Sequence, residues 1–287
     1  MQTPERIAVI GLGRMGGGLA RNLARHFDVT VFDLDQAAID RCVEAGAIAA
    51  RSAGEAADGA QLVVTSLPLP RHVRAVHRDL LAHLAPDTIV MDTSTVDPAT
   101  ATSVAELVGR ERFVACLLGK GPAQAEAGEV PLFVGGPDAA LDALVPVFDR
   151  IGATVHRLGT VEAATAFKLV SNLIGMTNLA VLAEGYTLCR TAGVDDAAFA
   201  SALADTGGWS YQAEVRLPWM MADDFAPRFS VALGLKDLTL ALGMAGQWGI
   251  PAPVGAAGLS QLASAMAHGH ADDDVTAILK VVDPQRS

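Results

Sequence analysis

Short apolar runs alternate with Ala-rich stretches through the first half of the chain. The runs are rich in Val and Ile, which predicts buried β-strands, and the stretches between them have the spacing of helices. We expect strands at 6–10, 28–32, 61–66, 88–92, 130–134 and 153–157, and helices at 17–26, 36–44, 71–83 and 99–108. Such alternation predicts parallel strands with crossover helices on both faces, which is a doubly wound α/β domain.

The pattern changes near residue 160, where the strand-like runs stop. Ala- and Leu-rich segments with helical spacing continue from there to the end of the chain. Residues 162–191 are compatible with one helix of about 30 residues, long enough to connect two domains. We therefore expect an α/β domain over 1–160 and an all-α domain over 161–287, joined by that helix.

The composition is that of a folded protein with a large core. Of 287 residues, 51% are apolar and 18% are charged, which excludes a disordered chain. A net charge of −11 disfavours nucleic acid and anionic membranes as partners, because both need a cationic surface. The most apolar stretch, 173–183, is short and contains polar residues, so we expect a buried helix there and not a membrane span.

The chain shows no pattern typical of secretion or of a metal site. The N-terminus lacks the basic start and the cleavage site of a signal peptide. Its three cysteines form no CxxC pair and are odd in number, which favours a reduced, cytoplasmic protein. His268, His270 and residues 272–274 have side chains of the types that bind metal ions. Three Asp before an apolar run are typical of a helix N-terminus, however, so we expect these Asp residues to cap a helix and not to bind a metal.

A glycine-rich turn follows the first predicted strand directly and precedes a predicted helix. Its residues are Gly11, Leu12, Gly13, Arg14, Met15 and Gly16, which form a GxGxxG pattern. In this context the first glycine permits a tight turn, the second allows the close approach of a pyrophosphate, and the third lets helix and strand pack closely. The N–H groups of the helix N-terminus would hold the phosphates. The turn therefore predicts a dinucleotide site.

Asp33 ends the second predicted strand, 22 residues after Gly11. A carboxylate there can accept hydrogen bonds from both hydroxyls of the adenosine ribose, and it would repel a 2′-phosphate. Neither Leu34 nor Asp35 supplies a cation for such a phosphate. We therefore expect NAD(H) in preference to NADP(H). The alternative is that Asp33 only caps the following helix.

These features resemble the β-hydroxyacid dehydrogenase family, whose best-known members act like 3-hydroxyisobutyrate dehydrogenase. The resemblance covers nearly the whole chain and rests on the turn at 11–20, on residues 159–172, and on residues 236–241, which match a KDLxLA signature. It implies a Rossmann domain, hydride transfer between NAD(H) and a small β-hydroxyacid or its semialdehyde, and a homodimer or homotetramer. It also implies cofactor contacts from the loops after two later strands, at Leu67, Pro68, Thr93, Ser94 and Thr95.

By the same resemblance, Lys168 is the catalytic acid and base, and Asn172 lies beside it. The spacing of four residues puts both on one face of a helix. An inward Lys among Ala, Phe, Leu and Val loses part of its proton affinity through desolvation, which suits proton transfer at working pH. It can protonate the oxygen that gains charge from the hydride, while Asn172 holds that oxygen or orients Lys168. The alternative is a Lys that extends along the helix to the surface.

The KDL segment supplies a second charged pair. The resemblance puts Lys236 near the nicotinamide, where it helps to close the site, and it puts Asp237 at the substrate end or in a structural pair with Lys236. The alternative is an exposed helix salt bridge worth less than about 1 kcal/mol.

One segment departs from the family pattern. Relatives carry a DAPVSGG-like sequence, with a serine that receives the substrate carboxylate, whereas this chain has Ala115–Pro122. Gly119 replaces the serine, or Leu118 does if one residue is inserted. We expect Lys120 to meet an anionic substrate group while Gly119 and Gly121 present backbone N–H groups. The alternative is a surface Lys in a glycine turn.

Other candidates are less specific. Trp209 and Tyr211 follow a glycine pair and are candidates to line the substrate cleft, with core packing as the alternative. His72, His77 and His83 share one predicted helix, where we expect no acidic or cysteine partner.

Two rival functions are compatible with part of this pattern. Imine reductases are a related class, but they tend to replace the catalytic Lys with Asp or Tyr. A noncatalytic dinucleotide-binding module would keep the glycine turn without needing Lys168. No hydrolase or kinase motif is found in the sequence.

Overall fold

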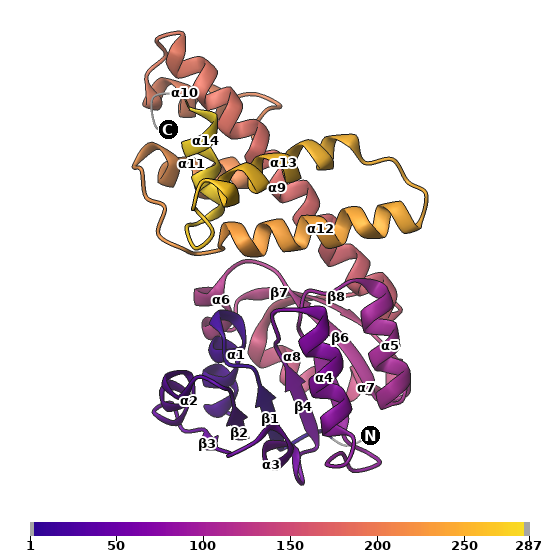
Figure 1. The fold of residues 1–287 in the computed structure, drawn as a ribbon. Helices are drawn as coiled ribbons and strands as arrows, with labels where there is room; N and C mark the ends of the chain where they lie inside the picture. The colour runs from indigo at the N-terminus through magenta and orange to yellow at the C-terminus, as the bar shows by residue number, and fades with distance from the viewer. Residues whose placement is uncertain (1–2, 284–287) are drawn as a thin grey trace. The chain divides into compact units, whose positions relative to one another are not determined.

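The structure, a computed structural model, describes residues 3–283. The chain divides into two compact units, residues 1–168 and 169–287. The first unit is an α/β domain and the second is helical, and the helix α9, Val161–Thr191, contributes residues to both (Figure 1). The fold class expected from the hydrophobic pattern is therefore confirmed.

An eight-stranded sheet forms the first unit, in the order β3-β2-β1-β4-β5-β6-β7-β8. The strands are β1 Arg6–Ile10, β2 Asp28–Phe32, β3 Ile48–Ala49, β4 Leu62–Thr65, β5 Ile89–Asp92, β6 Phe113–Leu118, β7 Val130–Gly135 and β8 Gly152–Arg157. Neighbouring strands are parallel except for β6 and β7. The order of the first six is that of a doubly wound dinucleotide-binding domain.

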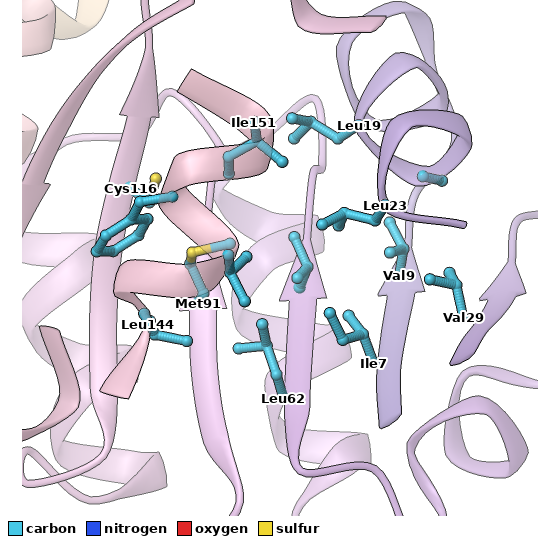
Figure 2. Close-up of a cluster of buried hydrophobic side chains, with 14 of the residues drawn as sticks. Ile7, Val9, Leu19, Leu23, Val29, Leu62, Met91, Cys116, Leu144 and Ile151 are labelled. Atoms are coloured by element: carbon cyan, nitrogen blue, oxygen red, sulfur yellow. The ribbon is translucent and has the colours of Figure 1, made fainter. Parts of the chain in front are cut away.

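Helices cover both faces of the sheet. They are α1 Arg14–Ala24, α2 Gln36–Val43, α3 Ala53–Ala57, α4 Pro70–Leu80, α5 Pro98–Val108, α6 Pro122–Ala127, α7 Asp138–Ala143 and α8 Val145–Ile151. Ile7 and Val9 of β1 lie in one core with Leu23 of α1 and Ile151 of α8 (Figure 2). Alternate residues of the same strand, such as Ala8, lie in a second core with α4 and α5. Burial on both faces explains why these strands are continuous apolar runs.

Three features of the sheet differ from the expectation. β3 is not among the expected strands, because its two residues are exposed and form no apolar run. β6 is not among them either, although it is a continuous buried run like β4 and β5. β7 is antiparallel to β6. A parallel crossover needs a dozen or more residues, and the connection 119–129 is shorter than that.

The second unit consists of the rest of α9 and five further helices. They are α10 Asp196–Ala204, α11 Tyr211–Met221, α12 Val231–Gln247, α13 Pro253–Ala267 and α14 Leu279–Val282, with a 3-10 turn at Val275–Ile278. Their core includes Leu179, Tyr186 and Leu238. Asp274 caps the 3-10 turn by accepting the Thr276 amide, which confirms the capping role expected for this acidic run.

Among the described residues, α9 is long and apolar enough to cross a membrane by length and composition. Core helices of folded domains meet the same criteria, and Leu179, Ala183 and Tyr186 of α9 are buried within the second unit. Val181 on the same helix is exposed, so burial of the 173–183 stretch is partial.

Candidate active site

The turn between β1 and α1 accepts only glycine at two positions. Gly11 has a φ of +90°, and a side chain there would collide with the Ser66 carbonyl oxygen. A side chain on Gly16 would collide with the carbonyl oxygen of Gly11. A Cβ on Gly13, in contrast, would meet no atom within 4 Å, so the backbone there borders open space. The backbone of the turn is therefore closely packed at Gly11 and Gly16, and it borders open space at Gly13.

The N-terminus of α1 is suited to hold an anion. Gly13 is the N-cap and has no side chain to cap the first N–H groups, and the first turn holds no acidic residue. The helix dipole and unpaired N–H groups attract a phosphate at such a terminus. Together with the open space at Gly13, this geometry fits the pyrophosphate of a nicotinamide dinucleotide.

Asp33 is held by the glycine turn. Its Oδ2 accepts the Leu12 amide at 2.5 Å, and its Oδ1 accepts the Asp35 amide at 2.8 Å. Asp35, not Asp33, caps α2, by accepting the Ala37 amide. The alternative that Asp33 only caps the next helix is therefore wrong. A negative charge is fixed beside the turn at the end of β2.

Two further strand ends are joined by a buried hydrogen-bond network. The Thr65 hydroxyl donates to Asp92 Oδ1 at 2.7 Å, and the Ser94 hydroxyl donates to the same oxygen at 2.6 Å. The Leu67 amide donates to Ser94 Oγ at 2.8 Å. Burial raises the pKa of Asp92, and the charge of His77 and the hydroxyls of Ser94 and Thr65 oppose this. The two loops expected at the cofactor, 66–68 and 93–95, are thus linked to each other.

The expectation for the histidine helix is wrong for two of its three residues. His77 on α4 is buried, and its Nε2 lies 3.3 Å from Thr65 Oγ1, within the electrostatic reach of Asp92. His83 Nδ1 lies 2.9 Å from Asp58 Oδ1. Both carboxylates belong to other elements of the sheet domain, so the spacing of the histidines along their helix could not predict these contacts. No three His, Cys, Asp or Glu side chains within residues 3–283 are arranged to hold a metal ion.

The loop after β6 shows why a serine is missing from it. The Gly119 amide donates to the Pro131 carbonyl at 2.9 Å, and a Cβ on Gly119 would lie 2.5 Å from Cγ of the Pro131 ring. A serine at position 119 would require that ring to move. Lys120 is exposed, with a φ of +56°, a left-handed conformation that costs a non-glycine residue roughly 1–2 kcal/mol. Pro131 therefore restricts which side chains fit at position 119, a role that the sequence pattern does not predict.

The helix that follows this loop packs on the cofactor helix. Two nitrogens of the Arg21 side chain, Nε and Nη2, donate to Glu126, with Nη2 2.6 Å from Oε2, and this hydrogen bonding lowers the pKa of Glu126. Asn22 Nδ2 donates to the Glu126 carbonyl at 3.1 Å. A Cβ on Gly18 would lie 3.2 Å from the Glu126 amide, so α1 and α6 are in close contact. Residues 119–121, directly before α6, are therefore anchored to the helix that begins at the glycine turn.

In the second unit, Asp237 brings two predicted site residues together. Asn172 Nδ2 donates to Asp237 Oδ2 at 2.6 Å, and Lys236 Nζ lies 3.0 Å from Asp237 Oδ1. Asp237 is only 2% exposed. The Lys236–Asp237 pair is therefore not the exposed helix salt bridge of the alternative interpretation. The contact fixes the plane of the Asn172 amide.

Lys168 lies one turn before Asn172 on the continuous helix α9 and is half-buried. Trp209 precedes α11, and Tyr211 is its first residue. Both are exposed, so core packing does not account for either.

Comparisons with known proteins agree with this geometry. Residues 6–159 match the family described as the NAD binding domain of 6-phosphogluconate dehydrogenase. Residues 163–282 match the family described as NAD-binding of NADP-dependent 3-hydroxyisobutyrate dehydrogenase. The chain belongs to the β-hydroxyacid dehydrogenase family. The resemblance inferred from the sequence motifs is therefore confirmed.

Relatives of this family match along almost their whole length. The chain is 34% identical to the NAD-dependent L-serine dehydrogenase of Pseudomonas aeruginosa, covering 98% of each protein. It is 30% identical to the 2-(hydroxymethyl)glutarate dehydrogenase of Eubacterium barkeri, covering 98% of this chain and 96% of that one. The solved structure of Mycobacterium tuberculosis 3-hydroxyisobutyrate dehydrogenase with L-serine matches with a TM-score of 0.89 and 28% identity, covering 98% of this chain and 99% of that one.

Proposed function

We propose that this protein catalyses reversible hydride transfer between NAD(H) and a small anionic β-hydroxyacid or its semialdehyde. The observation that carries the proposal is the hydrogen bond from Asn172 to buried Asp237, because it orders an amide one helical turn from Lys168. Family membership and the glycine turn at the N-terminus of α1 support the same conclusion. The nicotinamide ring, when bound, supplies or accepts the hydride.

Lys168 is the proposed acid and base. In the reductive direction it donates a proton to the carbonyl oxygen, and in the oxidative direction it removes the hydroxyl proton. Asn172 holds the same oxygen or orients Lys168. The family resemblance implies that Lys236 lies near the nicotinamide. Asp237 is the proposed positioning residue, since its two carboxylate oxygens contact Asn172 and Lys236.

NAD(H) is the proposed cofactor in preference to NADP(H). Asp33 supports this preference, because its carboxylate is fixed beside the glycine turn by two backbone amides. A 2′-phosphate beside that carboxylate would be repelled. The next residue, Leu34, is exposed and offers no compensating cation.

The proposed substrate carries an anionic group at the end remote from the reacting carbon. Lys120 supports this, because the loop holds it in a strained, solvent-facing conformation next to Gly121. The expectation that Gly119 also presents its N–H group to the substrate is wrong, since that N–H donates to the Pro131 carbonyl. Trp209 is the proposed apolar wall of the substrate site. The names of the relatives fit this class, since L-serine and 2-(hydroxymethyl)glutarate both carry carboxylates.

We further propose that the chain works as a homo-oligomer in the reducing interior of the cell. Ile174, Val181 and Leu188 are 56%, 61% and 71% exposed and recur every seven residues along α9. A seven-residue repeat forms a single apolar stripe on a helix, of the kind that a second copy covers. Three free cysteines support the reducing location.

The test is a substrate panel with the purified protein. L-serine, 3-hydroxyisobutyrate, their semialdehydes, a cyclic imine and a neutral alcohol would be assayed with NAD(H) and NADP(H) by nicotinamide absorbance. Turnover of an anionic hydroxyacid, faster with NAD(H), supports the proposal. Turnover of the imine alone would favour an imine reductase, and cofactor binding without any turnover would favour a binding module.

A variant of the proposed acid and base completes the test. Lys168→Ala should leave NADH affinity unchanged and lower kcat by about 10²–10⁴-fold, the usual contribution of acid–base catalysis. Residual activity near the wild-type level would contradict the role of Lys168.

A further inference from the structure

A chain of four buried side chains runs from α4 to the loop after β5. His77 Nδ1 lies 2.8 Å from the Val73 carbonyl oxygen, and His77 Nε2 lies 3.3 Å from Thr65 Oγ1. Thr65 Oγ1 lies 2.7 Å from Asp92 Oδ1, which also contacts Ser94. All four side chains are buried, and of the four only Ser94 belongs to the cofactor contacts that the family resemblance implies.

Hydrogen bonds hold each group of this chain in place. The Val73 carbonyl only accepts, so His77 Nδ1 carries a hydrogen. Asp92 Oδ1 contacts the Thr65 hydroxyl, the Ser94 hydroxyl and, at 3.3 Å, the Ser94 amide. Thr65 Oγ1 therefore links the carboxyl group of Asp92 to the imidazole of His77.

The chain is therefore a buried polar network in which the Thr65 hydroxyl bridges His77 and Asp92. Burying polar groups is expensive, and well-packed apolar residues are often at least as stabilising. Stability alone is thus a poor reason for this network. What distinguishes it is its position at the carboxyl ends of β4 and β5, where a doubly wound domain binds its ligand.

The network connects directly to both cofactor loops. Ser94 Oγ donates to Asp92 and accepts the Leu67 amide, so the loop after β5 holds the loop after β4. The Thr93 hydroxyl adds a second link by donating to the Thr65 carbonyl at 2.9 Å. Loss of the Asp92 carboxyl group removes the acceptor of Ser94, and loss of the Thr65 hydroxyl removes one of the hydrogen bonds that hold that carboxyl group in place.

We propose that Thr65 and Asp92, with His77 as the buried polar partner of Thr65, are positioning residues for the nicotinamide dinucleotide, acting through the loops at 66–68 and 93–95. The inference rests on the proposed function, since it assumes a dinucleotide on these loops. It assigns a role to three further residues, Thr65, His77 and Asp92, and none of them needs to contact the cofactor.

A matched pair of isosteric variants tests the proposal. Thr65→Val and Thr88→Val each remove one buried hydroxyl, but Thr88 bonds the Ala60 carbonyl just before the amino end of β5. Both should lose similar stability, of the order of one hydrogen bond. Only Thr65→Val should weaken NADH binding, by about tenfold in the Kd from calorimetry, at a temperature where both variants are folded. Equal Kd values for the two variants would overturn the inference.

A second experiment tests whether these hydrogen bonds act together. Asp92→Asn keeps the size of the side chain but has one acceptor oxygen, so it holds Ser94 and Thr65 less firmly and NADH binding should weaken. Thr65→Val in the same chain should add little to that loss, because both substitutions break the same network. Additive losses of NADH affinity, measured on folded protein, would overturn the inference.

The two proposals fail in distinguishable ways. If wild-type protein binds neither NADH nor NADPH, both the proposed function and this inference are wrong. If wild-type protein binds NADH and Thr65→Val binds it equally well, only the positioning role fails.

Discussion

Asn172 donates its side-chain amide to Asp237 across 2.6 Å, and this hydrogen bond joins α9 to α12 within the second unit. The other carboxylate oxygen of Asp237 lies 3.0 Å from Lys236 Nζ. Because one buried carboxylate holds both neighbours, the three side chains should act as a unit and not as independent contributors to catalysis.

Double substitution should reveal that coupling. Asp237→Asn cannot accept from both neighbours, so kcat should fall by about 10–100-fold, as for the loss of a buried charged hydrogen bond. In the Asn172→Ala background, the same substitution should cost much less, because the amide it orders is gone. Asp196→Asn is a matched control, since Asp196 accepts the Tyr186 hydroxyl at 2.8 Å elsewhere in this unit. Additive effects on kcat would refute the coupling.

Cofactor preference should change on removal of one charge. Asp33→Asn keeps the size of the side chain and one acceptor for the Leu12 amide, but removes the repulsion of a 2′-phosphate. The ratio of NADPH to NADH affinity should rise by about fivefold or more, since a charge contact at this distance is worth at least about 1 kcal/mol. Asp35→Asn removes the same charge two residues away and can retain the α2 cap. An equal shift in both variants would show that the effect is not specific to Asp33.

The sequence predicts most of the sheet domain because periodicity and glycine placement are local signals. The glycine turn, Asp33 and the strands β1, β2, β4 and β5 are identified from neighbouring residues alone. β3 is not predicted, because its two residues are exposed and form no apolar run. β6 is not predicted either, although it is a continuous buried run like β4 and β5. The interactions of His77 with Asp92 and of Glu126 with Arg21 are not predicted for another reason. In each case the two residues belong to separate elements, which come together only when the sheet and its helices are assembled.

The loop at residue 119 offers a test of side-chain volume. Gly119→Ser restores the family residue, but its Cβ would lie 2.5 Å from the Pro131 ring. Overpacking of this kind should cost about 1–3 kcal/mol of unfolding free energy. Pro131→Ala removes the ring, so the double variant should recover much of that loss. If Gly119→Ser is as stable as the parent protein in chemical denaturation, the steric explanation for the missing serine is wrong.

The contact between α1 and α6 should be sensitive to pH. Glu126 has its pKa lowered from 4.5, first by the hydrogen bond from Arg21. A lowered folded pKa contributes stability above the unfolded value and loses it as pH falls through the folded pKa. The side chain is 38% exposed, so the effect should be about 0.5 kcal/mol. Glu126→Gln should therefore destabilise the protein at neutral pH, and the difference should vanish in acid.

Glu129→Gln is the control for this titration, because it removes the same charge from the same segment. Its unfolding free energy, measured beside that of Glu126→Gln, should follow the wild-type value at neutral pH. A Glu126 difference that persists well below pH 4.5 would show that packing, and not the ion pair, is responsible.

Assembly of the protein should depend on the apolar stripe of α9. Val181→Glu puts a charge in the middle of the stripe formed by Ile174, Val181 and Leu188. If two copies meet across a twofold axis, each substitution appears on both sides of the contact, so repulsion and desolvation act twice. Light scattering should then show a smaller species than the wild type. Ile48→Glu, at a residue 63% exposed on β3, introduces the same charge away from α9 and should leave the mass unchanged. A Val181→Glu protein with the wild-type mass would exclude this stripe as the interface.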